Sequence, residues 1–228
     1  MLLYPVNLNI NNRLCVVVGG GAVALRKVNG LLAAGAAVRV ISPVLHKDLL
    51  ELSRKGSIEW LQRTYAEGDV TDAFLVFAAT DNSVVQAEIL GEAAKCGALI
   101  NSADNPQHSL FHVPAHFRRG NLLVSVSTSG GSPVLAGRLR QRLESLVGEE
   151  YEAVVSLLSL IRSELVSQNA DGQSNRRLFH RLLDRRLVEI VKDKNWFDLQ
   201  MLLIDELPAD LDGIVIMRKF MESYGVAT

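Results

Sequence analysis

The sequence predicts an α/β fold with a doubly wound parallel sheet, followed by a connecting strand and helix and by a small all-helical C-terminal domain. Two observations carry this prediction. Short apolar runs alternate with longer amphipathic stretches between residues 14 and 101, and strand-like runs disappear from residue 149 onward. Strands that alternate with helices are typical of a parallel sheet with helices on both faces.

The first part of the chain supplies five predicted strands and three predicted helices. The run LCVVV at 14–18 is typical of a buried strand, and Gly35 and Gly97 follow two of the helices, as C-cap glycines often do. The predicted strands are 14–18, 37–42, 58–61, 73–80 and 98–101, and the predicted helices are 21–34, 44–55 and 82–96.

The pattern changes after residue 101. Residues 102–120 contain Pro106, Pro114 and Gly120 and are predicted to be irregular. The remaining predicted elements are a strand at 121–128, a turn at 129–133, helices at 134–147, 149–168 and 176–194, an exposed loop at 169–175 and two or three shorter helices at the end.

Composition places the chain among ordinary globular proteins. It has 228 residues, a net charge of -1, 48% hydrophobic and 21% charged residues. This charge argues against bulk electrostatic binding to nucleic acid or to an anionic membrane, and no apolar run is long enough to span a bilayer. The start of the chain lacks the features of a signal peptide, so we expect a cytoplasmic protein in which Cys15 and Cys96 are buried, reduced thiols.

A glycine triplet directly follows the first predicted strand. Gly19, Gly21 and Ala24 match G-x-G-x-x-A between a strand and a helix. In this context the first glycine allows a tight turn, the second lets the backbone approach a pyrophosphate, and the small third residue packs the helix on the strand. The N–H groups at the helix start then face the diphosphate. The motif predicts a Rossmann-like dinucleotide-binding domain.

The second predicted strand lacks the acidic residue that usually holds the adenosine ribose of NAD. Ser42, Pro43 and Val44 stand at this corner, where the Ser42 hydroxyl and backbone groups could bind the ribose. No arginine follows to recommend a 2′-phosphate, although His46 and Lys47 leave NADP open. We expect NAD.

Three further residues follow strand ends on the same predicted edge. Ala79 and Thr80 follow the fourth strand and are expected to contact the cofactor, and Asn101 ends the fifth. Asp104 then projects from a loop at the edge that carries the glycines. On generic grounds a loop aspartate more often forms a turn than takes part in catalysis.

Four segments together resemble the precorrin-2 dehydrogenase family, which opens siroheme synthase and also occurs as free-standing proteins. They are GGGAVALRKV, AATDN, NSADNPQHSLFHVPA and LLVSVSTSGGSPVLAGRLRQRLE, and the resemblance covers about residues 5 to 147. It implies NAD-dependent oxidation of precorrin-2 to sirohydrochlorin, with iron insertion in some members. The chain stops where bifunctional members continue into a methyltransferase, so that activity is not expected.

The resemblance also assigns roles to residues. It implies that Asp104 is catalytic, which reverses the generic expectation, and that Pro43 and Val44 lie on the adenosine side, with Thr80 and Asn101 near the nicotinamide ribose. It implies a homodimer formed through the connector strand and the following helix, with the tetrapyrrole between the cofactor domain and the helical region. The residues implied to hold the pyrophosphate are Gly19, Gly20, Gly21, Ala22, Val23 and Ala24.

These assignments lead to three predicted parts: an NAD-binding domain over 1–113, a dimerisation connector over 114–148 and a helical domain over 149–228. The carboxylates of the substrate require cations and helix N-termini, and Ser132, Arg138 and Arg142 offer both. Ser132 can cap a helix that begins at Pro133.

The sequence also contains a possible metal-binding pattern and leaves two alternative functions open. His108, His112 and His116 recur every fourth residue, but Pro114 interrupts any continuous helix, so no resident metal site is expected. A non-enzymatic NAD(H)-sensing regulator is the main alternative, and a two-domain dehydrogenase of a small hydroxy acid is the second, although no suitable histidine–carboxylate pair is evident.

Overall fold

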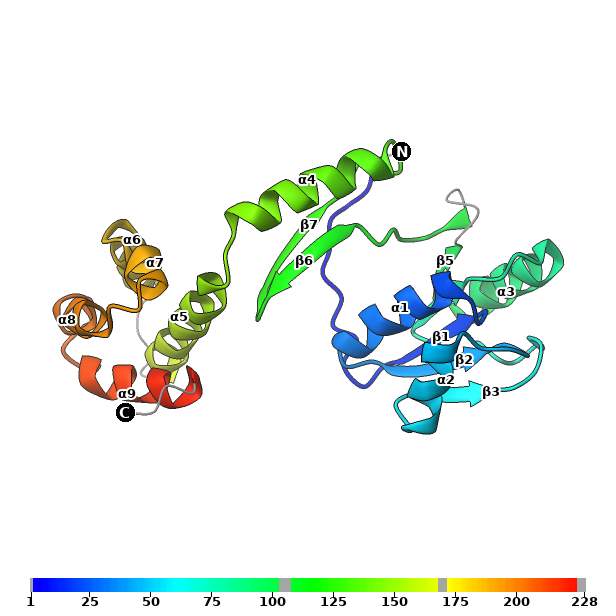
Figure 1. Cartoon of the computed structure of the whole chain (residues 1–228), viewed down its shortest axis with the longest axis horizontal. Helices are drawn as coiled ribbons and strands as arrows, with labels where there is room; N and C mark the ends of the chain where they lie inside the picture. Colours follow the sequence, from blue (N-terminus) through cyan, green and yellow to red (C-terminus); the bar gives the residue numbers. More distant parts are fainter. Residues whose placement is uncertain (1, 103–107, 168–171, 225–228) are drawn as a thin grey trace. The chain divides into compact units, whose positions relative to one another are not determined.

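The computed structural model describes residues 2–102, 108–167 and 172–224. Two compact units make up the chain, Met1–Val113 and Pro114–Thr228, and Figure 1 traces their elements in chain order. In the described part of the chain, no helix combines the length and the apolar character needed to cross a membrane.

The first unit is built on a five-stranded parallel sheet. In chain order its strands are β1 (Leu14–Val18), β2 (Ala37–Ile41), β3 (Glu59–Leu61), β4 (Leu75–Ala78) and β5 (Leu99–Ser102), and their spatial order is β3-β2-β1-β4-β5. The chain therefore moves outward from β1 to β3 and then returns to the other side of β1. This reversal creates a switch point between β1 and β4, where open α/β sheets bind ligands at the carboxyl ends of their strands. The predicted fold class is confirmed.

Helices cover both faces of the sheet. Val17 faces a core that includes residues of α1 (Ala22–Ala33) and α2 (Lys47–Arg54), whereas Val16 and Val18 face a core completed by α3 (Ser83–Cys96). Because both faces are buried, β1 is a continuous apolar run instead of an alternating one.

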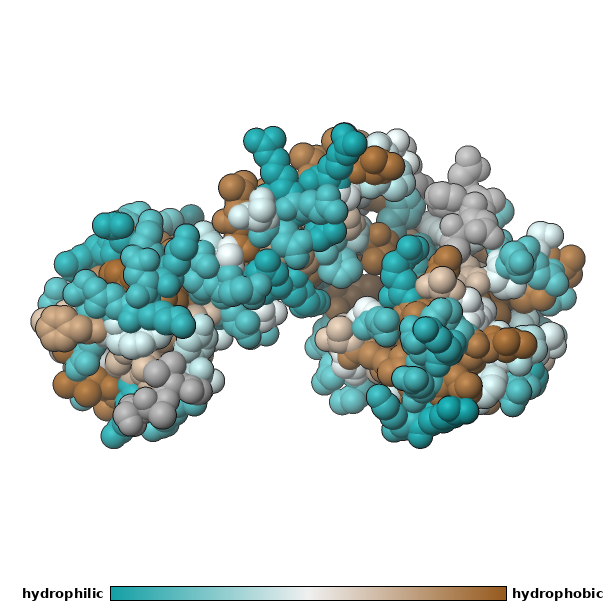
Figure 2. Space-filling model, in the orientation of Figure 1, coloured by the Kyte–Doolittle hydropathy of each residue, from teal (hydrophilic) through white to brown (hydrophobic). Residues whose placement is uncertain are grey.

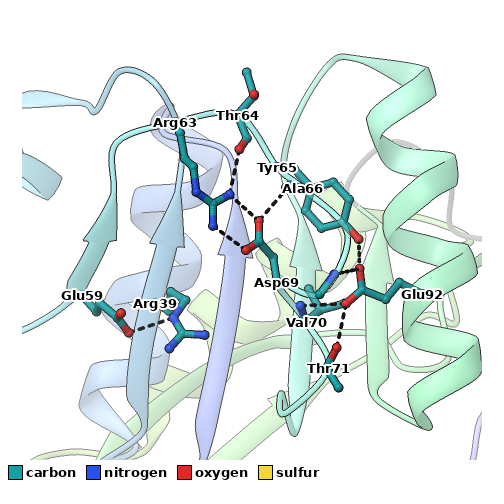
Figure 3. A network of polar contacts seen from close by, with 11 residues as sticks. Arg39, Glu59, Arg63, Thr64, Tyr65, Ala66, Asp69, Val70, Thr71 and Glu92 are labelled. Atoms are coloured by element: carbon teal, nitrogen blue, oxygen red, sulfur yellow. Dashed lines mark hydrogen bonds and ion pairs between the residues drawn. The ribbon is translucent and has the colours of Figure 1, made fainter.

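The connection between β3 and β4 contains no helix and is fastened to α3 by one carboxylate (Figure 3). Glu92 accepts hydrogen bonds from the Gly68 N–H (3.0 Å), the Val70 N–H (3.1 Å), the Thr71 hydroxyl (3.2 Å) and the Tyr65 hydroxyl. Burial alone would raise the pKa of Glu92, but the hydrogen bonds from Tyr65, Val70 and Gly68 outweigh it and lower that pKa. The connection is thus ordered by buried polar bonds in place of a crossover helix.

A second carboxylate fixes the same connection from within. Arg63 donates two hydrogen bonds to Asp69, at 2.7 and 2.6 Å, and the Ala66 N–H donates to it at 2.8 Å. The hydrogen bond from Arg63 is the main cause that lowers the pKa of Asp69. This bidentate ion pair between Arg63 and Asp69 closes the turn that leads into β4.

The segment at 108–113 returns along β5 and closes the first unit. The Leu110 N–H donates to the Ile100 carbonyl (2.9 Å), and the Ser109 hydroxyl accepts from the Ser102 N–H (3.0 Å). Phe111 packs edge-on against Phe77 of β4 with ring centroids 5.5 Å apart. The chain on the C-terminal side of residue 107 is therefore anchored to the sheet.

The second unit begins with a hairpin and a helix. Strands β6 (Ala115–Arg119) and β7 (Leu122–Val126) pair antiparallel across a turn at Gly120, whose φ is +53°. Helix α4 (Pro133–Leu146) packs on both strands. The five helices that follow enclose a core of their own, centred on residues such as Leu157, Leu199 and Phe220. They are α5 (Glu150–Ser167), α6 (Gly172–Asp184), α7 (Leu187–Lys192), α8 (Trp196–Glu206) and α9 (Gly213–Tyr224).

The structure corrects four local predictions. The loop predicted over 169–175 is too long, because α6 begins at Gly172. Strand β6 lies in the stretch predicted to be irregular, because it is held by pairing with β7 and buries only Phe117 deeply. The helix predicted over 176–194 is broken into α6 and α7 at Arg186, which has a φ of +63°. Cys15 is buried as expected, but Cys96, in the last turn of α3, is exposed, with its thiol 3.6 Å from the carbonyl oxygens of Val70 and Ala93. The division of the second unit into a connector and a helical domain stays a prediction.

Candidate functional site

Gly19 lies where β1 ends beside β4, at the switch point. Its φ is +128°, a region that residues with a Cβ rarely adopt, and a Cβ at this position would overlap the Ala79 carbonyl. Its N–H donates to the Ile41 carbonyl of β2 at 2.9 Å. Only glycine allows the chain to turn so closely between β2 and the end of β4.

Gly20 joins this turn to the loop after β2. A Cβ on Gly20 would overlap the Val44 carbonyl, and the Gly20 carbonyl accepts a hydrogen bond from the His46 N–H at 2.7 Å. The glycine loop and the loop after β2 are thus held together by a backbone hydrogen bond and by close packing.

Gly21 is the N-cap residue of α1 and differs from the two glycines before it. Its φ of -87° and ψ of -167° are ordinary extended values, no side chain caps the helix there, and a Cβ would meet nothing within 4 Å. No acidic residue stands in the first turn. Uncapped N–H groups, the positive end of the helix and open space are what a diphosphate requires. The residues present therefore fit the pyrophosphate of a dinucleotide.

The three residues that follow Gly21 in the motif differ in burial. Ala24 is fully buried in the core against the sheet, as the motif predicts, whereas Ala22 and Val23 are exposed at the helix start. The backbone N–H groups of this first turn are the groups available to an anion.

The loop after β2, which forms one rim of the predicted cofactor site, is held by hydrogen bonds that the sequence does not indicate. The Ser42 side chain is buried, its hydroxyl donates to the Val44 carbonyl (2.7 Å), and its own carbonyl accepts from the Trp60 indole (2.9 Å). Pro43 and Val44 are exposed. The oxygen of Ser42 keeps acceptor capacity for a ribose hydroxyl, and this contact stays a prediction.

The loop after β4 forms the other rim of the predicted cofactor site, and hydrogen bonds hold it at both Ala79 and Thr80. The Ala79 N–H donates to the Val18 carbonyl at 2.8 Å, and the Thr80 hydroxyl oxygen accepts from the Asn82 N–H at 3.3 Å. Gln86, which sequence reasoning did not single out, donates from its amide to the Thr80 carbonyl at 2.5 Å. A helix-forming stretch gives no signal that one of its polar side chains reaches back to the preceding loop.

The last two residues predicted at this edge are Asn101 and Asp104. Asn101 is buried in β5 and donates from its amide to the Phe111 carbonyl at 2.9 Å, so it holds the returning segment against the sheet. Asp104 lies outside the described residues. Its role and the contact of Asn101 with the nicotinamide ribose stay predictions.

Sequence reasoning also missed Lys27, a half-buried cation on α1. Its ammonium group lies 5.2 Å from the centre of the Phe77 ring. Burial, with a smaller contribution from Arg26, lowers the pKa of Lys27. The aromatic contact stabilises the charge, so Lys27 brings positive charge into the face of the sheet that α1 covers.

The residues expected to bind substrate carboxylates lie on α4 in the second unit. The Ser132 hydroxyl accepts from the Leu135 N–H at 3.2 Å and Pro133 is the first helical residue, which confirms the predicted cap. Arg138 and Arg142 are exposed and lie one turn apart on this helix. Their contact with substrate stays a prediction.

Comparison with known proteins agrees with this arrangement. A family model of NAD(P)-binding domains matches residues 6–115, and a model described as sirohaem biosynthesis protein central matches residues 119–146. The siroheme synthase of Nitrosococcus oceani is 41% identical over 179 residues, which are 78% of this chain and 38% of that protein. Siroheme synthase 1 of Serratia proteamaculans is 35% identical over 210 residues, 92% of this chain and 44% of that protein.

A solved structure with a similar fold aligns with nearly the whole chain. SirC, a precorrin-2 dehydrogenase, is 27% identical, with a TM-score of 0.66 over 99% of this chain and 100% of that one. The chain spans about two fifths of the length of the siroheme synthases that it matches. The glycine-rich edge of the first unit, the matched central segment and the likeness to SirC place this chain in the family of precorrin-2 dehydrogenases and siroheme synthases.

Proposed function

We propose that this chain oxidises precorrin-2 to sirohydrochlorin with NAD in siroheme biosynthesis. The observation that carries the proposal is the cradle at Gly21, an uncapped helix start with open space, in a chain whose relatives are siroheme synthases. Cytoplasmic location and NAD in preference to NADP are parts of the same proposal.

The residues of the first unit bind and orient the dinucleotide. The N–H groups at the start of α1 hold the diphosphate, and the rim residues Val44 and Thr80 flank its two halves. When bound, the nicotinamide ring supplies the hydride acceptor. The close backbone packing of Gly19 and Gly20 holds both rims in place before the cofactor binds.

Asp104 is the proposed general base. Oxidation of precorrin-2 would remove a hydride, for which a bound nicotinamide would be the acceptor, and a proton, which the Asp104 carboxylate would accept. The products are sirohydrochlorin, NADH and a proton released to solvent. A positioned base of this kind contributes roughly 10²–10⁴ to the rate.

Helix α4 is proposed to serve both the substrate and the dimer. Arg138 and Arg142 offer guanidinium groups to the carboxylates of precorrin-2. Leu135, Leu139 and Leu143 recur every fourth residue and are 50%, 40% and 37% exposed, which supports a homodimer formed through this helix. Figure 2 shows hydrophobic and hydrophilic residues side by side over α4.

The test is a spectroscopic assay with the full chain. Enzymatically generated precorrin-2 and NAD⁺ should yield the absorbance of sirohydrochlorin together with one equivalent of NADH, and NADP⁺ should serve poorly. A chain that binds NADH but leaves precorrin-2 unchanged would favour the NAD(H)-sensing alternative. Fe²⁺ or Co²⁺ added to the product, compared with spontaneous insertion, decides whether the chain also inserts metal.

A further inference from the structure

The loop between β4 and α3 is held by contacts on both sides of Thr80. On one side, the carbonyl of Ala79 packs so closely on Gly19 that no Cβ fits between them. On the other, the side-chain amide of Gln86 donates to the carbonyl of Thr80 at 2.5 Å. The peptide planes before and after the Thr80 Cα are therefore both fixed. When both neighbouring planes are fixed, the direction of the Cα–Cβ bond of Thr80 is fixed as well.

The hydroxyl group of Thr80 is also oriented. Its oxygen accepts a hydrogen bond from the Asn82 N–H at 3.3 Å. A hydroxyl has one hydrogen to donate and two lone pairs, so the Thr80 hydrogen is left to donate elsewhere. Thr80 is half-buried at the carboxyl edge of β4, where a cofactor at the switch point would lie.

The amide of Gln86 does not serve as the cap of its own helix. Asn82 caps α3 by accepting from the N–H groups of Val84 (3.0 Å) and Val85 (3.2 Å), and the Gln86 N–H donates to the Asn82 carbonyl (3.0 Å). The side-chain amide is an addition to that pattern, directed back to the loop one turn earlier. Its bond to Thr80 acts on the shape of the loop.

We propose that Gln86 is a positioning residue for the dinucleotide. It does not contact the cofactor. It fixes the peptide after Thr80 so that the Thr80 hydroxyl donates to the bound dinucleotide without a prior rearrangement of the loop. The proposal rests on the dinucleotide site of the proposed function and does not depend on precorrin-2 as substrate.

The test measures NADH binding by fluorescence titration of the full chain. Gln86→Met keeps the length of the side chain and removes its donor, and we expect binding about 3- to 10-fold weaker, the effect of one neutral hydrogen bond. Gln200→Met is the matched control, because Gln200 is also a half-buried helical glutamine but lies on α8 in the second unit. The control should bind NADH like the wild type.

A double-mutant cycle separates positioning from a general loss of structure. In a Thr80→Val background the hydroxyl is gone, so adding Gln86→Met should weaken NADH binding by less than 2-fold further. An equal loss in both backgrounds, or unchanged binding by Gln86→Met, overturns the proposal. A wild type that fails to bind NADH overturns both this proposal and the proposed function, whereas normal NADH binding without oxidation of precorrin-2 overturns the proposed function alone.

Discussion

Gly21→Ser is the substitution that best separates the fold of the glycine loop from its binding of a diphosphate. The backbone at Gly21 is extended and its Cβ would meet nothing within 4 Å, so serine fits without strain. Serine is also a preferred N-cap, and it should raise the free energy of unfolding by a few tenths of a kcal/mol. The variant is therefore expected to be at least as stable as the wild type.

Gly21→Ser should also weaken dinucleotide binding. Its side chain enters the space of the diphosphate and takes up one of the N–H groups at the start of α1. A hydrogen bond to a charged group contributes about 1.5–3 kcal/mol, which corresponds to roughly 10- to 150-fold in the dissociation constant of NADH.

Gly19→Ala is the matched comparison and should behave in the opposite way. At a φ of +128° an alanine costs about 1–3 kcal/mol in backbone strain, and its Cβ would also overlap the Ala79 carbonyl. With a further cost of about 1–3 kcal/mol for that overlap, this variant should lose roughly 2–6 kcal/mol of stability.

Both variants are measured by urea unfolding and by NADH titration. Trp60 lies in the first unit and Trp196 in the second, so a Trp196→Phe background reports the first unit alone. Wild-type affinity for NADH in Gly21→Ser would refute the placement of the diphosphate. Wild-type stability in Gly19→Ala would refute the close approach of β1 to the end of β4.

The remaining predictions concern four other residues. Glu92→Gln should lower the free energy of unfolding by about 2–4 kcal/mol at pH 7, because an amide cannot accept from all four donors. Folding lowers the pKa of Glu92, so the ionised carboxylate stabilises the fold fully above the ordinary pKa of 4.5, and this stabilisation is lost as the pH falls through the pKa of the folded state. The difference in unfolding free energy between wild type and Glu92→Gln, measured by urea unfolding, should therefore shrink in acid. Asp104→Ala should reduce kcat roughly 10²- to 10⁴-fold with unchanged NADH binding, and near-normal turnover would remove Asp104 from the mechanism. Leu139→Glu should shift sedimentation from dimer to monomer, whereas an unchanged dimer would place the interface elsewhere. Arg142→Gln should raise the KM for precorrin-2 more than it lowers kcat, and an unaffected KM would separate this arginine from the substrate.

The strand–glycine–helix unit could be predicted because its physical causes are local. Buried parallel strands are continuous apolar runs, and a turn as tight as that at Gly19 excludes any residue with a Cβ. The cap at Ser132 and the helix start at Pro133 were predictable for the same reason. The five parallel strands follow from these local signals combined with their alternation along the chain.

Two of the features that could not be predicted depend on partners distant in sequence, and a third has no local sequence signal. Strand β6 depends on pairing with β7, and its sequence AHFRR has little strand character by itself. Glu92 holds a connection more than twenty residues earlier, and nothing in the helical pattern around it indicates this. Arg186 breaks a helix without glycine or proline, so no local signal marks the break. For β6 and for the connection that Glu92 holds, the tertiary contact determines the local structure.

The loop after β2 explains why the diphosphate cradle should dominate dinucleotide affinity in this chain. The hydroxyl hydrogen and the carbonyl of Ser42 are already engaged within the protein, and Val44, which is 74% exposed, offers an apolar side chain. The first carboxylate after β2 in the sequence is Asp48, already within α2. The adenosine ribose therefore has no carboxylate at the end of β2 to bind its hydroxyls, and a larger share of the binding free energy must come from the N–H groups at the start of α1. For this reason a change at Gly21 should weaken binding more than any single change at residues 42–44.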